Sequence, residues 1–557
     1  MIKMKANRLL SIYRESLVNN SELPALSEYG EDEGKVFTYS DLATIIARQH
    51  LFFELAGLKP GDRVALLGKN TPAWISAFMA TITYGAVIVP VLQDFSAPDA
   101  QHIINHSGAK LLYVSQSVWE TLDPECLETV EAVISLESRR ILYEKDGDRA
   151  EKIMRNLNRK FKGRYKEGFT PDLLKFPELP DSHVCIINYT SGTTGYSKGV
   201  MLTLDNILGN VEFGINSKLH FRGSRCLSFL PLAHTYGCAF DMLVPLAVGT
   251  HIVVFGKPPV PRLLLAAMDK VRPNLVVCVP LILEKIYRKQ IVPMITRRPV
   301  RWVLNVPFLD SVIYSKIRTK LTEAFGGKFT EVIIGGAPLN REVELFLRKI
   351  GFRYTVGYGM TECGPLISFA PWDKFAVGSC GSVLPNMEVR ILSDDQEKIP
   401  GEICVKGQNV MKGYYRNEEA TRAVLDKDGW LHTGDIGVVV GSERNLFIKG
   451  RSKTMILSAT GQNIYPEEIE SKLNNLPFVA ESLVVQRGAG LTALIYPDME
   501  QVDAQRIEFS EVERILNDGL AEFNKLVAPY ERINNIVFVD NEFEKTPKRS
   551  IKRYLYE

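Results

Sequence analysis

Residues 189–199 read Tyr189-Thr190-Ser191-Gly192-Thr193-Thr194-Gly195-Tyr196-Ser197-Lys198-Gly199, directly after an apolar run from Val184 to Asn188. The apolar run predicts a buried strand. Five Ser/Thr hydroxyls, three glycines and one lysine lie within the eleven residues. Glycine lets a backbone approach a ligand closely, hydroxyl and amide groups donate hydrogen bonds, and lysine adds a positive charge. The stretch therefore predicts a loop that wraps a phosphate group.

Two known signatures match this loop only in part. A Walker loop needs Gly-Lys-Ser/Thr, whereas here Gly199 follows Lys198, and the preceding glycine, Gly195, lies three residues before the lysine. Gly195 to Gly199 matches the Gly-x-Ser-x-Gly elbow of an esterase, but that serine should follow a strand directly, and Ser197 does not. A Gly-rich turn with a structural role only is the third interpretation. An esterase would also need a triad histidine. The candidates, none with independent support, are His220, His234, His251 and His432.

The chain around the loop alternates extended and helical patterns, which indicates an α/β protein with open, largely parallel sheets. Such sheets bind ligands in crevices at the ends of strands. The predicted strands are Arg63 to Leu67, Lys110 to Val114, Val184 to Tyr189, His251 to Phe255, Leu275 to Val279 and Glu331 to Ile334.

The pattern changes near Lys449, after a strand-like run from Asn445 to Ile448. We therefore expect a large N-terminal domain over residues 1–450 and a small α+β domain over residues 451–557. Within the small domain, Pro466 to Asn475 predicts a helix, because Pro suits the first helical position and acidic residues suit the first turns. Leu483 to Gln486 and Ala493 to Tyr496 predict strands.

Composition excludes several classes of protein. Among 557 residues, 45% are hydrophobic and 24% charged, as in ordinary folded domains, and the net charge of +2 creates no global field that would attract nucleic acid. The eight cysteines form no Cys-x-x-Cys pair, which argues against a zinc ribbon and for a reducing compartment. No apolar h-region follows Met1, so we expect no signal peptide and a cytoplasmic location.

Three stretches raise the question of a membrane. Thr71 to Gln93 has no charge, but its polar residues and Gly85 predict a buried helix and strand in place of a span. Basic runs at Arg139 to Lys166 and Arg288 to Arg301 read first as solvated faces. The alternative is peripheral contact with an anionic membrane surface or an acidic carrier protein.

Five further motifs follow the loop in order. They are Phe229-Leu230-Pro231-Leu232-Ala233-His234, Gly335-Gly336-Ala337-Pro338-Leu339, Gly357-Tyr358-Gly359-Met360-Thr361-Glu362, Trp430-Leu431-His432-Thr433-Gly434-Asp435 and Lys449-Gly450-Arg451-Ser452-Lys453. Together with the loop they resemble the adenylate-forming (AMP-binding) superfamily over nearly the whole chain. The resemblance implies a large domain of open α/β sheets with a β-barrel-like subdomain, and a small mobile α+β C-terminal domain.

The resemblance also implies roles for single residues toward ATP, Mg²⁺ and an acid. Tyr358 would stack on adenine, Asp435 would accept from the ribose, Arg451 would donate to the nucleotide, and His234 would lie beside the substrate carboxylate. Glu362 would hold Mg²⁺, with Thr190 as a second ligand. The implied ATP- or AMP-binding set is Thr190, Ser191, Gly192, Thr193, Thr194, Gly195, Lys198, Gly336, Ala337, Pro338, Tyr358, Gly359, Met360, Thr361, Asp435 and Arg451. Lys453 resembles the hinge and Gly461 the glycine of the coenzyme A tunnel.

The implied reaction has two steps. A carboxylate attacks the ATP α-phosphorus and expels pyrophosphate, and a thiol, coenzyme A first, then attacks the acyl-adenylate and releases AMP. Catalysis of the first step is mainly positioning and charge neutralisation. The segments Asn7 to Leu26 and Phe37 to Leu42 most resemble long-chain fatty acid–CoA ligases, which favours a medium- or long-chain fatty acid.

Several alternatives stay open. We expect pocket residues from the ranges 234–246, 279–291 and 334–366. Within them, the apolar side chains of Leu243, Val244, Leu246, Leu281 and Leu283 would suit an acyl chain and would equally suit a core. An aryl or other hydrophobic acid would also suit apolar walls. An acyl-carrier protein is the alternative acceptor to coenzyme A. The sequence does not indicate the oligomeric state.

The C-terminus departs from the family pattern. Ser550-Ile551-Lys552-Arg553 places serine where the adenylation lysine is expected. Lys548 and Lys552 lie two residues to either side and would point the same way in an extended segment. We hypothesise that Lys552, or second Lys548, takes the catalytic role. A weakened adenylate-binding protein is the remaining alternative.

Overall fold

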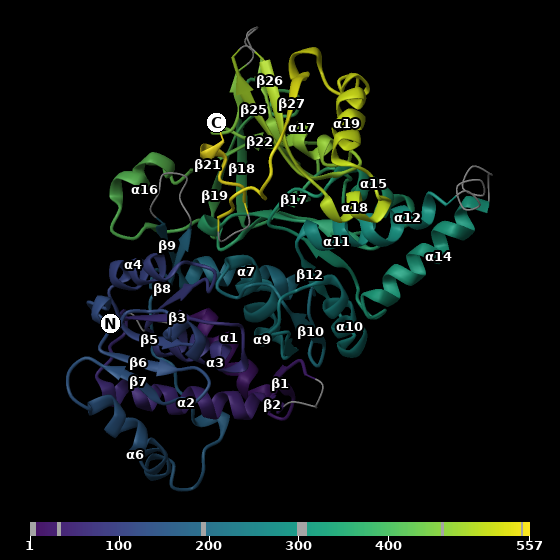
Figure 1. The fold of residues 1–557 in the computed structure, drawn as a ribbon. Helices are drawn as coiled ribbons and strands as arrows, with labels where there is room; N and C mark the ends of the chain where they lie inside the picture. Colours follow the sequence, from purple (N-terminus) through teal and green to yellow (C-terminus); the bar gives the residue numbers. More distant parts are fainter. Residues whose placement is uncertain are drawn as a thin grey trace.

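An eight-stranded sheet contains the two strands that flank the predicted phosphate loop in the sequence (Figure 1). The computed structural model describes residues 7–30, 35–190, 197–297, 309–457, 462–488, 490–546 and 550–556. The central strands β8, β4, β3, β5 and β6 run parallel to one another. Strands β20, β9 and β7 add antiparallel edges. In sheet order the bounds are β20 Gly413–Tyr414, β9 Lys198–Thr203, β8 Val184–Thr190, β4 Val87–Val91, β3 Arg63–Leu67, β5 Ala109–Val114, β6 Ala132–Ser135 and β7 Ile141–Glu144.

The uncharged stretch after residue 70 forms helix α3 (Pro72–Tyr84) and strand β4, as predicted. Thr71 caps the helix by accepting from the Trp74 amide, and Gly85 ends it with φ +89°. The buried hydroxyls of Ser76 and Thr81 donate to carbonyls one turn back, which satisfies them inside the core. Among the described residues, no helix is long and apolar enough to cross a membrane.

Two further groups of mostly parallel strands carry residues on the other side of the candidate site described below. Strands β10, β11 and β1 run parallel, β2 adds an antiparallel edge, and β12, β13 and β14 run parallel to one another. An isolated bridge between Cys226 and Leu275 links the two groups. The bounds are β1 Pro24–Glu28, β2 Phe37–Thr38, β10 Arg225–Ser228, β11 His251–Val254, β12 Val276–Cys278, β13 Val332–Ile334 and β14 Tyr354–Val356. All six predicted strands are thus confirmed.

A seven-stranded antiparallel sheet follows and corresponds to the expected barrel-like subdomain. Its order is β15 (Tyr358–Gly359), β16 (Leu366–Phe369), β17 (Ser382–Val383), β22 (Asn445–Arg451), β21 (Leu431–Val440), β19 (Gly401–Gly407) and β18 (Met387–Leu392). Strand β22 continues to Arg451, past the expected end of a strand at Ile448.

The last hundred residues have hydrophobic clusters of their own, made only of residues from Ile464 onward. Strands β25 (Val479–Arg487), β26 (Gly490–Pro497) and β27 (Ile533–Phe538) form their sheet. The same stretch of chain also contains three helices, α17 (Pro466–Leu473), α18 (Met499–Gln505) and α19 (Phe509–Phe523) (Figure 1). The small α+β unit is therefore present, and the helix and both strands predicted in it are confirmed. Its boundary at residue 450 stays a prediction.

Polar contacts join this unit to the large domain. Asn340 caps helix α15 (Arg341–Lys349) and donates through Nδ2 to Ser471 O at 3.2 Å and Asn475 Oδ1 at 2.7 Å. Arg288 donates to Asn474 O and Val479 O, and Lys289 pairs with Glu500. The start of the second basic run is therefore a domain contact. The expectation of a solvated face is wrong for Arg288, which is half-buried, whereas the Lys289 side chain stays 59% exposed.

Asn340→Ser separates the two tasks of Asn340. Serine keeps a cap acceptor for α15 but cannot reach α17, so we expect near-native stability and faster amide hydrogen exchange in residues 466–475. Asn340→Ala loses the cap as well and should lower the free energy of unfolding by about 1 kcal/mol. Urea unfolding and hydrogen exchange measure the two effects. Unchanged exchange in Asn340→Ser would contradict the contact.

Candidate active site

The phosphate loop joins two antiparallel strands. Thr190, the last residue of β8, lies directly across from Lys198, the first residue of β9. Ser191, Gly192, Thr193, Thr194 and Gly195 lie outside the described residues, so their predicted roles stay predictions. The esterase interpretation is wrong, because a nucleophile elbow turns from a strand into a helix, whereas Ser197 leads into strand β9.

Tyr414 connects two predicted site residues and was not predicted itself. Its strand β20 extends the sheet beside β9. Lys198 Nζ lies 5.1 Å from the centre of the Tyr414 ring, within cation–π range. The Tyr414 hydroxyl donates to Glu362 Oε1 at 2.9 Å. Burial raises the pKa of Tyr414, and the Glu362 carboxylate raises it further, so the hydroxyl stays protonated. The Gly413-Tyr414-Tyr415 run offered no sequence signal for this role.

Glu362 fits the expected cation role. Its carboxylate is half-buried in a short 3₁₀ turn, η5 (Thr361–Cys363), that packs on β9. Oxygen ligands of this kind are what Mg²⁺ prefers. The Tyr414 hydroxyl occupies one carboxylate oxygen and thereby orients the other. Glu362 therefore suits a Mg²⁺ ligand, and Thr190 as its second ligand stays a prediction.

A pocket brings several predicted residues together. Its cavity volume is about 50 Å³, within about 530 Å³ of unfilled space that includes open solvent. The predicted site residues that line it are His234, Gly336, Tyr358, Gly359, Met360 and Thr361. Its apolar walls include Leu219, Phe240, Ile333, Leu366 and Phe369. The pocket therefore combines the expected nucleotide and acid positions in one cavity.

The chain forms this pocket where parallel strands end. Gly335 and Gly336 follow β13, and Gly357 and Tyr358 follow β14. Gly336 has φ +84°, which favours glycine. Ala337 and Pro338 continue from it on the exposed surface. The pocket therefore lies beyond the carboxyl ends of parallel strands, where sheets of this kind bind ligands.

Tyr358 is fixed by its hydroxyl. It donates to Asp435 Oδ2 at 2.6 Å, and Arg451 Nε lies 3.1 Å from Asp435 Oδ1. Asp435 and Arg451 face each other across β21 and β22. Burial raises the pKa of the Asp435 carboxyl, and Arg451 opposes that shift. The three residues predicted for adenine, ribose and nucleotide contacts thus form one network.

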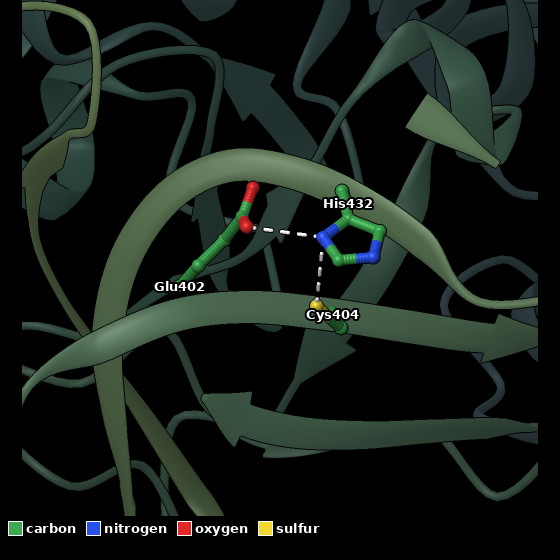
Figure 2. A group of neighbouring side chains, drawn as sticks. All are labelled: Glu402, Cys404 and His432. Atoms are coloured by element: carbon green, nitrogen blue, oxygen red, sulfur yellow. Dashed lines mark hydrogen bonds and ion pairs between the residues drawn. The ribbon is translucent and has the colours of Figure 1, made fainter. Parts of the chain in front are cut away.

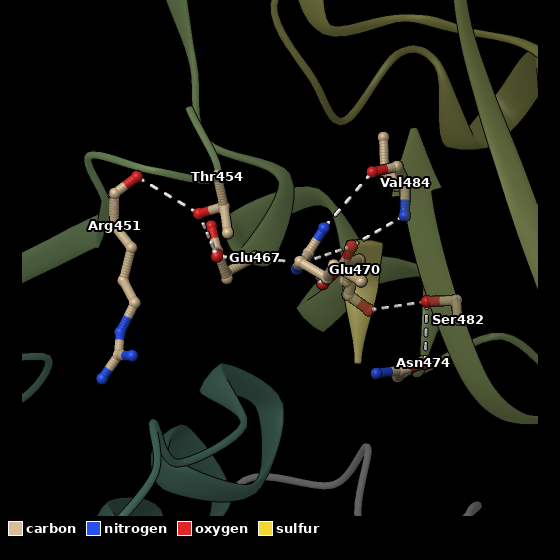
Figure 3. A network of polar contacts seen from close by, with 8 residues as sticks. Arg451, Thr454, Glu467, Glu470, Asn474, Ser482 and Val484 are labelled. Atoms are coloured by element: carbon tan, nitrogen blue, oxygen red, sulfur yellow. Dashed lines mark hydrogen bonds and ion pairs between the residues drawn. The ribbon is translucent and has the colours of Figure 1, made fainter. Parts of the chain in front are cut away.

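The expected hinge lies beside a polar network at the start of the small unit (Figure 3). Thr454, next to Lys453, donates to Arg451 O at 3.2 Å and to Glu467 Oε1 at 2.6 Å. Lys453 is exposed. Gly461 lies outside the described residues, and its predicted role in the thiol tunnel stays a prediction.

The C-terminal tail doubles back near Ser550. Lys545 and Ile551 pair in antiparallel fashion, and the Thr546 amide donates to Ser550 O. The relative direction of Lys548 and Lys552 stays a prediction. Lys552 Nζ pairs with Glu544 at 3.3 Å, and Ser550 is exposed. Lys548 lies outside the described residues.

Arg553 anchors this tail to the small unit. Its guanidinium donates to Glu470 Oε1 at 2.6 Å. Glu470 also accepts from the Val484 amide at 2.7 Å (Figure 3). Glu470 is 9% exposed. A buried carboxylate with these donors holds the segment that carries Ser550 and Lys552 against the sheet.

The five apolar residues expected to suit an acyl chain lie outside the pocket. Leu243, Val244, Leu246 and Leu283 belong to the main hydrophobic core, and Leu281 is 51% exposed. The alternative that they belong to a core is therefore confirmed for four of the five. From the expected range 234–246 the pocket takes His234, Thr235, Tyr236 and Phe240 instead. The apolar residues that do line it lie mainly near Ile333 and Leu366.

Comparison with known proteins agrees with this geometry. Residues 13–415 match the AMP-binding enzyme family. The chain belongs to that family. Relatives include a 4-coumarate–CoA ligase of Vanilla planifolia, 29% identical over 97% of this chain and 91% of its own length. Long chain acyl-CoA synthetase 6, peroxisomal, of Arabidopsis thaliana is 32% identical over 81% of this chain and 66% of its own.

Solved structures match the AMP-binding fold across the chain. The anthranilate CoA ligase AuaEII in complex with anthranoyl-AMP gives a TM-score of 0.77 at 20% identity, covering 99% of this chain and 96% of that one. ATP-bound MatB from Rhodopseudomonas palustris gives 0.74 at 23% identity, covering 99% and 98%. These matches support the division into large and small units.

Tyr414→Phe removes the hydrogen bond to Glu362 and keeps the ring under Lys198. A hydrogen bond to a charged group contributes about 1.5 kcal/mol or more, so the affinity for Mg²⁺-ATP should fall about tenfold. Tyr414→Leu also loses the ring and should weaken binding further. Calorimetric titration measures both, with Tyr415→Phe as the matched control. A native affinity in Tyr414→Phe would contradict the role of the hydroxyl.

Proposed function

We propose that this chain is an ATP-dependent acid–CoA ligase that acts on a medium- or long-chain fatty acid. The observation that carries the proposal is the single pocket in which His234, Tyr358 and Thr361 share a cavity with apolar walls. A nucleotide site alone would not need those walls, and a fatty acyl chain would bury them favourably. The relatives include long-chain acyl-CoA synthetases, which supports this substrate class.

The residues suit adenylate formation as follows. Lys198 would hold phosphate oxygens beside the loop, and Thr361 would donate to the α-phosphate. Asp435 would accept from the ribose hydroxyls, and Tyr358 would present its ring to adenine. Mg²⁺ bound at Glu362 would neutralise phosphate charge. The carboxylate oxygen of the acid then bonds to the α-phosphorus as the bond to pyrophosphate breaks.

The second step transfers the acyl group to a thiol. The thiolate sulfur of coenzyme A attacks the acyl carbon, and AMP leaves with the bonding electron pair. Rotation of the small unit about Lys453 would separate the two steps. The contacts of Asn340 and Arg288 with that unit are polar and few, which suits a movable interface.

An aryl acid is the second candidate substrate, because 4-coumarate–CoA ligases are among the relatives. Pyrophosphate release with ATP, Mg²⁺ and acids from acetate to oleate, plus 4-coumarate, distinguishes the two. We expect release to peak at a medium or long chain and to turn over repeatedly with coenzyme A. A peak at 4-coumarate would overturn the fatty-acid assignment, and turnover only with holo acyl-carrier protein would overturn the acceptor.

The serine at position 550 gives a sharp test of the adenylation step. We propose that Lys552 replaces the expected lysine after it leaves Glu544. Lys552→Met should then lower acyl-adenylate formation about 100-fold, as for loss of one transition-state donor. Thioester formation from synthetic acyl-AMP should stay native. Lys548→Met is the matched comparison. If both variants adenylate at the native rate, neither lysine acts; if no variant or native enzyme adenylates, the chain is a weakened adenylate-binding protein.

We propose separately that the chain lies in the cytoplasm and makes peripheral contact with a membrane. Helix α6 (Arg149–Arg164) carries the first basic run, and three of its cations are already paired, at Lys152, Arg155 and Arg164. We expect weak, salt-sensitive binding to anionic vesicles through the remaining charges. Sedimentation at low salt measures it, and no binding there would contradict the proposal.

A further inference from the structure

Three metal-binding side chains gather on two neighbouring strands outside the pocket (Figure 2). Cys404 on β19 lies directly across from His432 on β21. Glu402 lies two residues before Cys404 and therefore on the same face of β19. Figure 2 shows the Glu402 carboxylate and the Cys404 sulfur both facing the same ring nitrogen, Nδ1, of His432.

The distances between donor atoms lie near those around a tetrahedral ion, one of them slightly shorter and one within the tetrahedral range. His432 Nδ1 lies 3.0 Å from Glu402 Oε2 and 3.5 Å from Cys404 Sγ. All three donors lie within 4.8 Å of one another. Bonds of about 2.0–2.3 Å at tetrahedral angles place donors roughly 3.3–3.7 Å apart. Small side-chain rotations would therefore close the set on an ion without moving the strands.

We propose that Glu402, Cys404 and His432 form a binding site for a borderline-soft divalent cation, Zn²⁺ foremost. One thiolate, one imidazole and one carboxylate are the ligand types that Zn²⁺ takes, and they suit Mg²⁺ poorly because of the sulfur. On binding, the thiol proton goes to solvent and the imidazole keeps its proton on Nε2. Water fills the fourth position, since the Glu402 and His432 side chains are 28% and 32% exposed.

Neighbouring groups orient the Glu402 carboxylate, but the positive charge of one of them, Arg390, repels a bound cation. Glu402 Oε1 accepts from the Gly434 amide at 3.1 Å, which orients the other oxygen toward His432. Arg390 lies across from Cys404 on β18 and brings a positive charge close to the sulfur. That charge is held on the Trp430 ring at 4.3 Å and paired with Asp426 at 3.4 Å. Asp426 thus offsets the repulsion that Arg390 would exert.

The site is joined to the nucleotide residues through β21. Asp435, which binds ribose under the proposed function, lies three residues after His432, and Glu402 holds the amide of Gly434 between them. Rotation of the Glu402 side chain toward Zn²⁺ would weaken its hydrogen bond with the Gly434 amide and so loosen the backbone next to Asp435. Occupancy should therefore lower the affinity for AMP, which makes the cation an inhibitor. This consequence rests on the proposed function, whereas the metal site does not.

The test uses the full-length, chelator-treated protein with Co²⁺ and Zn²⁺ as probes. We expect one Co²⁺ per chain with a thiolate-to-cobalt charge-transfer band, which Zn²⁺ abolishes by displacement. Cys404→Ser should remove the band, and His432→Ala and Glu402→Gln should weaken binding at least tenfold. Cys126→Ser is the matched control, because Cys126 is an exposed free cysteine outside the site, and its band should be native.

The native protein alone can overturn the proposal. Absence of the charge-transfer band in the native chain, or its persistence in Cys404→Ser, would exclude the site, whatever the folding of the other variants. Neither measurement needs an acid substrate, so failure here is distinct from failure of the proposed function. AMP titration with and without Zn²⁺ then tests the coupling, and equal affinities despite bound Zn²⁺ would overturn the inhibition.

Discussion

The antiparallel return of β9 along β8 is the constraint on which the site depends. It places Lys198 across from Thr190 and keeps the connecting loop at the end of a buried strand. It also leaves an edge of β9 free for β20, whose Tyr414 reaches both Lys198 and Glu362. A helix after the loop, as in a nucleophile elbow, would remove that edge and with it the link between the cation and the carboxylate.

Two buried carboxylates each bind two donor groups. Asp435 accepts from Tyr358 and pairs with Arg451, and Glu470 accepts from Arg553 and the Val484 amide. Such groups are costly to bury alone and specific when paired. One network orders the nucleotide side of the pocket, and the other fixes the tail. The same principle places Glu402 between the Gly434 amide and His432, where a cation could replace a proton.

The two structural units differ in how they are stabilised and how they are joined. Each has a hydrophobic cluster of its own, and the polar contacts between them include those of Asn340, Arg288 and Lys289. Apolar burial therefore stabilises each unit, while exchangeable hydrogen bonds set their relation. The basic side chains of the second charged run take part in that relation, which a count of charges along the chain does not reveal.

The sequence by itself determined the strand and helix pattern, the small C-terminal unit and the family motifs, because local periodicity and ordered motifs are properties of neighbours in the chain. It also located His234, Tyr358, Thr361 and Asp435. Only the tertiary structure decided that Tyr414 supports Glu362, that Leu243 and Leu281 do not line the pocket, and that the tail doubles back beside Ser550. These facts depend on which distant residues meet: Tyr414 lies 52 residues from Glu362, and Cys404 lies 28 from His432. Sheet pairing brings such residues together, and no local pattern records it.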